Sequence, residues 1–138
     1  MLKVSRRLNY GLQLMIALAT KDQYSSSSTS ALGEQLQIPI PFLHQIAHIL
    51  MKQGLIKATP GPKGGLKLGS KPESISLLDI YVALEGEFVP PVFENDENKE
   101  EPVPECIAAN ELWTETGEKI CDYFDSIKLS DLMKKEEK

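Results

Sequence analysis

The 138-residue chain has no long apolar run and only two cysteines, and acidic residues are scarce in its first half. No segment approaches the roughly 20 consecutive apolar residues that a membrane-spanning helix needs, so we expect no membrane partner. Cys106 and Cys121 lie several turns apart in a segment predicted to be helical, too far for a disulfide on one straight helix. The chain therefore lacks a secreted, disulfide-stabilised framework, and we expect a cytoplasmic protein.

The scarcity of acidic residues is confined to the first half of the chain. Residues 1–72 hold nine lysines and arginines but two carboxylates, whereas residues 73–138 hold six basic and 18 acidic residues, and the net charge is −5. This asymmetry suggests that the first half meets a polyanion while the second half does something else. The alternative is that the lysines only keep the surface solvated.

Catalytic and metal-binding patterns are also missing. No Ser/His/Asp triad or pair of carboxylates stands out, so we do not expect an enzyme. His44 and His48 have the i, i+4 spacing that can hold a metal ion, but no third ligand is visible nearby. A polar pair that faces DNA is the preferred interpretation, with no metal site.

Residues 42–68 carry the clearest pattern, an amphipathic helix followed by two short strands. The i, i+3, i+4, i+7 spacing of its apolar residues predicts one buried stripe, made by Leu43, Ile46, Ala47 and Leu50. The opposite face carries hydrogen-bonding side chains and a cation but no carboxylate, as suits a surface that meets DNA. Its members are Pro41, His44, Gln45, His48 and Lys52.

Two short strands are expected after this helix, which Gly54 ends. Residues 55–58 and 66–68 can pair across the GPKGG turn, whose glycines permit positive φ values. Lys63 at the turn and Lys67 in the second strand are candidate DNA contacts. The whole segment has the outline of a recognition helix and a wing.

The N-terminal residues 5–19 predict another amphipathic helix, with apolar positions at Leu8, Leu12, Met15, Ile16 and Ala19. A signal peptide ending at residues 17–19 is the alternative, but Asn9 and Gln13 interrupt its apolar run. Arg6 and Arg7 fall at the start of the helix, where the helix dipole disfavours cations. Contact with phosphate is the role we expect for them.

The remaining elements complete a mainly α fold with a small β wing. The end of the serine tract 25–30 can cap a short helix with Leu32 and Leu36 on its buried side, and Pro41 suits the first position of the next helix. Ser76 and Asp79 predict a capping box for a helix that ends at Gly86. We therefore expect a winged helix-turn-helix domain at 1–86 and an acidic, proline-containing loop at 87–105. A dimerisation helix and C-terminal turn follow at 106–138, with dimer contacts at Leu112, Trp113, Ile120 and Phe124.

Residues 10–86 resemble the winged helix-turn-helix domain of the iron–sulfur cluster regulator family, which includes nitric-oxide-sensing and cysteine-metabolism repressors. The resemblance is carried by the GPxGG wing, the following S-I-x-L-x-D-I-x-x-A-x-E-G stretch, and the ELW and IKLSDL segments near the end. It implies a homodimeric bacterial transcription regulator, here expected to be a sequence-specific repressor of double-stranded DNA targets with an unknown effector. The long helix would cross its twin in the dimer.

Two departures from the family pattern bear on function. Cluster-binding relatives use three closely spaced cysteines, and only Cys106 lies near one of those positions. We therefore expect no iron–sulfur cluster, which would need carboxylates, Cys121 or ligands from a second chain. In the wing, Pro60 replaces an arginine that enters the minor groove, and Lys63 offers only a point charge in its place.

Alternatives stay open at particular residues and for the whole chain. Gln45 matches a family position that reads base edges, where it can engage adenine, or it is a solvated surface residue. Cys106 is a candidate redox sensor that cross-links the dimer, or an inert thiol. The chain as a whole could instead be a cluster-free winged-helix scaffold that binds a protein partner.

Overall fold

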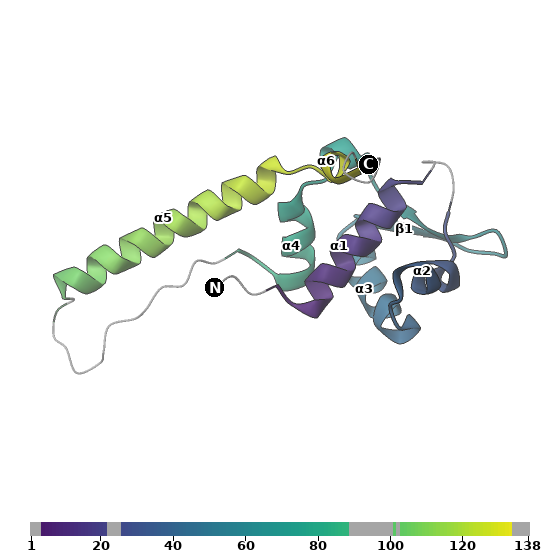
Figure 1. Cartoon of the computed structure of the whole chain (residues 1–138), viewed down its shortest axis with the longest axis horizontal. Coiled ribbons are helices and arrows are strands. Elements are labelled where there is room, and N and C mark those ends of the chain that lie inside the picture. The colour runs from purple at the N-terminus through teal and green to yellow at the C-terminus, as the bar shows by residue number, and fades with distance from the viewer. Residues whose placement is uncertain (1–3, 22–25, 89–100, 102, 134–138) are drawn as a thin grey trace.

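The computed structural model describes residues 4–21, 26–88, 101 and 103–133. Most of the predicted acidic loop at 87–105 lies outside these residues. The described chain is mainly helical with a two-stranded wing, as predicted (Figure 1). Its elements are α1 (Arg6–Ala19), α2 (Thr29–Leu36), α3 (Ile40–Lys52), β1 (Ile56–Thr59), β2 (Gly65–Leu68), the 3-10 turn η1 (Pro72–Ser74), α4 (Leu77–Glu85), α5 (Pro104–Ser126) and α6 (Leu129–Met133).

Serine side chains begin three of the helices. The hydroxyl of Ser5 accepts a hydrogen bond from the amide of Leu8 (3.0 Å), and Ser28 caps α2 in the same way. Ser76 and Asp79 form the predicted capping box at the start of α4. These side chains satisfy amides that the first helical turn leaves without a backbone partner.

Two predicted helix starts were wrong by a short distance. Pro41 is not the first residue of α3, because Ile40 precedes it in the helix and Pro39 is the N-cap. Proline is tolerated there because the first-turn amides have no helical acceptor anyway. The last long helix begins at Pro104 and not at Cys106, since proline also fits its first turn.

The core forms where α1, α3 and α4 meet. The predicted stripe of α3 is buried along its whole length, and Leu14 and Met15 of α1 are fully covered. Ile80 and Leu84 of α4 belong to this core, which extends to buried side chains of α2, the wing and α6. Each fully buried aliphatic side chain contributes roughly 1.5–3 kcal/mol of transfer free energy. The burial fixes the orientation of α3, with its polar face outward.

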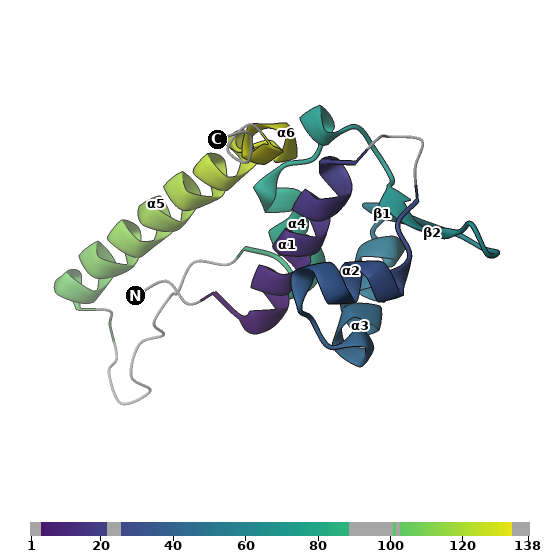
Figure 2. The ribbon, with the colours of Figure 1, turned by 45° about the vertical axis from the view of Figure 1, so that its right-hand side comes forward.

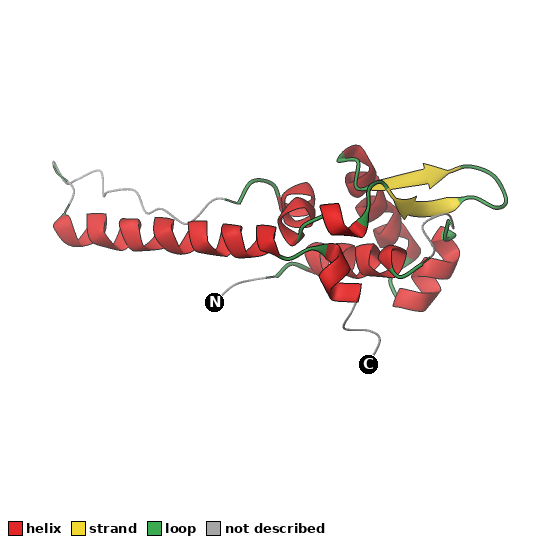
Figure 3. Ribbon diagram, turned by 90° about the horizontal axis from the view of Figure 1, so that it is seen from above, coloured by secondary structure: helices red, strands yellow, loops and turns green. Residues whose placement is uncertain are grey.

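The wing is an antiparallel hairpin with Ile56 opposite Leu68 and Lys57 opposite Lys67. Ser27 adds a short bridge on the other side of β2, because its backbone exchanges two hydrogen bonds with Leu66 (2.9 and 2.7 Å). This bridge ties the hairpin to the segment that precedes α2. The wing and α5 extend from opposite ends of the body (Figure 3).

Helix α5 projects away from the other elements, and Gly117 is the one residue of this helix that is buried (Figure 1). Its C-terminal end is nevertheless attached to the body. The amide of Leu77 donates to the carbonyl of Ile127 (2.9 Å), and that of Leu129 donates to Ile75 (2.8 Å). The base of α5 is therefore fixed next to α4, while most of its length is not covered by any of the described residues.

Candidate nucleic-acid interface

The outward face of α3 carries all the side chains predicted for it. Pro41, His44, Gln45, His48 and Lys52 are each exposed. Helix α3 contains no carboxylate, and Lys52 lies in its last turn. An exposed helix with amide, imidazole and ammonium groups can donate hydrogen bonds to base edges and phosphates in a major groove.

The N-terminus of α1 lies beside this face. Arg7 lines a hollow of about 470 Å³ together with Phe42, Gln45 and His48. An edge-to-face contact between the rings of Tyr10 and Phe42, with centroids 5.4 Å apart, packs the two helices together. The fold thus brings Arg7 to Gln45 and His48, two of the residues predicted to face DNA, although more than 30 residues separate them from Arg7 in the sequence.

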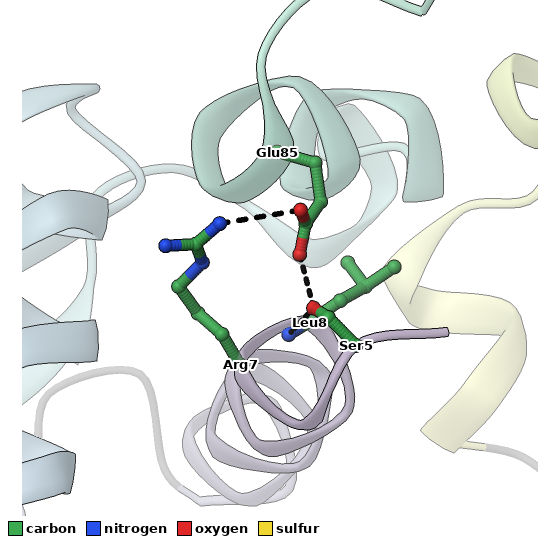
Figure 4. Close-up of polar contacts among 4 residues, drawn as sticks. All are labelled: Ser5, Arg7, Leu8 and Glu85. Atoms are coloured by element: carbon green, nitrogen blue, oxygen red, sulfur yellow. Dashed lines mark hydrogen bonds and ion pairs between the residues drawn. The ribbon is translucent and has the colours of Figure 1, made fainter. Parts of the chain in front are cut away.

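Arg7 is oriented by a carboxylate from α4 (Figure 4). Its guanidinium forms an ion pair with Glu85 (3.2 Å), and the hydroxyl of Ser5 donates to the other oxygen of the same carboxylate. The Arg7 side chain remains 47% exposed. One face of the guanidinium fork is therefore held by the protein and the rest is available to a ligand, whereas Arg6 is exposed and has no ion-pair partner among the described residues.

The wing adds two cations on one face of the hairpin. Lys57 and Lys67 lie directly opposite each other in the register, and their side chains therefore project from the same face. Like charges in this arrangement destabilise a strand pair unless a counter-charge neutralises them. Lys63 lies in the turn at the tip and is exposed. This geometry suits contact with a polyanion.

Lys57 is a functional candidate that the sequence reasoning missed. It lies in the first predicted strand, but its significance depends on the register that places it opposite Lys67. The signal was present in the alternation of Ile56, Lys57 and Ala58, since this pattern puts the lysine on the solvent face. Without a fixed partner residue, that alternation alone does not indicate a like-charged pair.

The described residues do not offer a metal or cluster site. Among them, no group of three or more His, Cys, Asp or Glu side chains lies close enough to hold a metal ion, and His44 and His48 gain no third ligand. Cys106 and Cys121 are half-buried free thiols on α5, separated along the helix axis by roughly 22 Å at 1.5 Å per residue. Two thiolates so placed cannot ligate one iron–sulfur cluster within a chain, and the sequence has no other cysteine.

The predicted dimer contacts divide into two groups. Leu112 and Trp113 are 55% and 41% exposed on the projecting part of α5. Ile120 is half-buried and lies about 20° from Trp113 around the helix. Phe124 instead packs within the chain, in an aromatic cluster with Tyr81 and Phe88 at centroid distances of 5.8 Å. Phe124 therefore helps to fix the base of α5.

Comparison with known proteins gives one consistent family. The profile of the Rrf2 family, described as an iron-dependent transcriptional regulator, matches residues 4–135. The transcriptional regulator CymR of Bacillus subtilis is 34% identical over 131 residues, which cover 95% of this chain and 89% of CymR. The transcriptional regulator IscR of Vibrio campbellii is 26% identical over 136 residues, or 99% and 80% of the two chains.

Solved structures agree in fold over nearly the whole chain. The structure of CymR, the global cysteine regulator of Bacillus subtilis, matches with a TM-score of 0.81 at 34% identity and covers 97% of this chain and 98% of that one. IscR of T. potens matches with a TM-score of 0.77 at 29% identity over 97% and 88% of the chains. None of the described helices has the length and apolar character needed to cross a membrane.

Proposed function

The chain belongs to the Rrf2 family of transcriptional regulators, and from this membership we propose that it acts as a homodimeric, sequence-specific repressor in the cytoplasm. Each chain would place α3 in a major groove and the wing against the neighbouring backbone. The single observation that carries the proposal is the outward face of α3, a helix packed on the core, which is free of carboxylates and flanked by Arg7. Repression would follow from competition with the transcription machinery for the site.

The exposed apolar side chains of α5 support the homodimer. Leu112, Trp113 and Tyr123 are large and exposed. Leu112 and Tyr123 lie about 20° apart around the helix and form an apolar stripe, and Trp113 lies about 100° to one side of Leu112. Covering such a stripe with its copy in a second chain removes apolar surface from water. This contributes roughly 25 cal/mol per Å² in favour of association, against which the entropy lost on association must be set. A symmetric dimer would also present two copies of α3, as a near-palindromic site of half-sites about 34 Å apart requires.

Fluorescence anisotropy tests the proposal directly. Purified protein is titrated onto the duplex upstream of its own gene and onto a scrambled duplex of equal length, at two salt concentrations. We expect tight binding to the first duplex, at least about 1,000-fold tighter than to the scrambled one, and weakening of both as salt rises. The variant Gln45→Ala should lower this ratio by losing a base contact worth about 1–3 kcal/mol.

Two outcomes would count against the proposal. Equal weak binding to both duplexes contradicts sequence-specific recognition of this site and favours the scaffold that binds a protein partner. A Gln45→Ala variant with an unchanged ratio contradicts base reading by Gln45, even if the protein binds DNA. Thr114→Ala, which truncates an exposed, uncharged side chain on α5 away from the proposed DNA contacts, provides the matched control.

A further inference from the structure

A cavity of about 810 Å³ lies where the C-terminal end of α1, the end of β2, η1 and α6 meet. In the views of Figures 1 and 2, α6 lies on the side of the body opposite α3. No residue of α3 or of the wing turn at 60–64 lines the cavity, and all of these residues are described. Lys67 is the one proposed DNA contact among the described lining residues, so the proposed DNA interface does not explain the rest of the lining.

The lining of this cavity is rich in cations. Lys21, Lys67 and Lys71 line it, with Glu73 as the one carboxylate among the described lining residues. None of the three lysines forms an ion pair with another described residue. Unpaired ammonium groups gathered around one hollow attract an anion, and the field is stronger in a concave site than on a flat surface.

An apolar floor accompanies these cations. Leu18 and Ala19 of α1 are 6% and 4% exposed, and Leu68 and Met133 are half-buried beside them. Small-molecule sites commonly have volumes of roughly 300–1,000 Å³ and combine apolar walls with a few polar groups. The arrangement suits a small organic anion that sets a carboxylate or phosphate against the lysines and a short carbon skeleton against the floor.

We propose that this lysine cavity, formed around Lys21, Lys67 and Lys71, is an effector site for a small organic anion. Lys67 connects the cavity to the wing, because it belongs to β2 and lies opposite Lys57. An anion that pairs with Lys67 removes one cation from the wing face and so weakens DNA binding. Binding to the cavity stands independently, whereas this regulatory effect rests on the proposed function.

Isothermal titration calorimetry of the full chain without DNA tests the binding. The probes are inorganic phosphate, citrate and glucose 6-phosphate, each at the same ionic strength set with sodium chloride. At least one probe should bind once per chain, and the double variant Lys21→Gln/Lys71→Gln should weaken that binding at least tenfold. Lys119→Gln should leave it unchanged. Absence of binding by all three probes, or equal binding by all variants, would overturn the proposal.

Fluorescence anisotropy with the operator duplex tests the regulatory half. The probe that binds should lower the DNA affinity of the wild type at constant ionic strength, and it should have no such effect on the double variant, which keeps Lys67. An unchanged DNA affinity in the wild type would overturn the regulatory role. Failure of the proposed function itself would be distinguishable, because the protein would then not bind the duplex even without a probe.

Discussion

Arg7 combines a structural contact and a predicted DNA contact in one side chain. Its ion pair with Glu85 is partly exposed to solvent, and exposed ion pairs contribute roughly 0–1 kcal/mol. We therefore expect Arg7→Ala to change the free energy of unfolding by less than about 1 kcal/mol while it lowers operator affinity about tenfold. Urea denaturation and anisotropy measure the two quantities. An unchanged operator affinity would mean that the guanidinium of Arg7 contacts Glu85 and not DNA. Lys119→Ala, which also removes one positive charge, is the control for the loss of charge.

Gly65 is the residue on which the attachment of the wing depends. Its φ is +153°, and a Cβ atom there would collide with the backbone carbonyl of Ser27, which bridges to Leu66. Gly61 also has a positive φ, +100°, but a Cβ there would meet nothing within 4 Å. Both alanine variants carry backbone strain of about 1–3 kcal/mol, so their difference isolates the collision.

We predict that Gly65→Ala lowers the free energy of unfolding by at least about 2 kcal/mol more than Gly61→Ala does, because backbone atoms cannot move aside as a flexible side chain can. Urea denaturation of the two variants in parallel gives the difference. Equal losses would mean that the Ser27 bridge yields easily and that the wing is not held by it.

The wing provides a test at the level of the element, because stability and function should change in opposite directions. Replacing Lys57 removes its repulsion with Lys67, so Lys57→Gln should raise the free energy of unfolding by about 0.2–1 kcal/mol. The same change should weaken binding to all duplexes alike and reduce the salt slope by about 1, as expected for a phosphate contact. If Lys57→Gln lowered the free energy of unfolding and left DNA binding unchanged, Lys57 would not be a phosphate contact that is repelled by Lys67.

Local elements could be predicted from the sequence, whereas contacts between distant residues could not. The apolar spacing of α3 and the Ser76–Asp79 capping box are short-range patterns, and both were confirmed. The pair Arg7–Glu85 joins residues 78 positions apart, and no local pattern indicates it. The packing of Phe124 within the chain could not be predicted for the same reason. Helical spacing placed it among the dimer contacts, but its packing on Tyr81 and Phe88 depends on how α5 docks against α4.

The exposed side chains of α5 allow a test of the proposed dimer. Leu112 and Thr114 are both exposed but lie on different sides of the helix, since two residues correspond to a rotation of about 200°. Leu112→Lys should therefore convert the dimer to a monomer by placing a charge in the apolar interface, whereas Thr114→Lys adds the same charge away from it. Sedimentation velocity measures both. A monomeric wild type, or dissociation of both variants alike, would contradict the assignment.

The salt dependence of DNA binding tests the molecule as an assembled dimer. If about six cations per chain neutralise phosphates, the slope of log affinity against log salt is about −5 for one chain and about −10 for a dimer. The monomer produced by Leu112→Lys keeps every proposed DNA contact, so its slope should fall to half that of the wild type. Anisotropy titrations over a range of salt concentrations measure both values. Equal slopes would mean that one chain of the dimer makes all the contacts, because two symmetric copies of α3 and the wing require the slope to double.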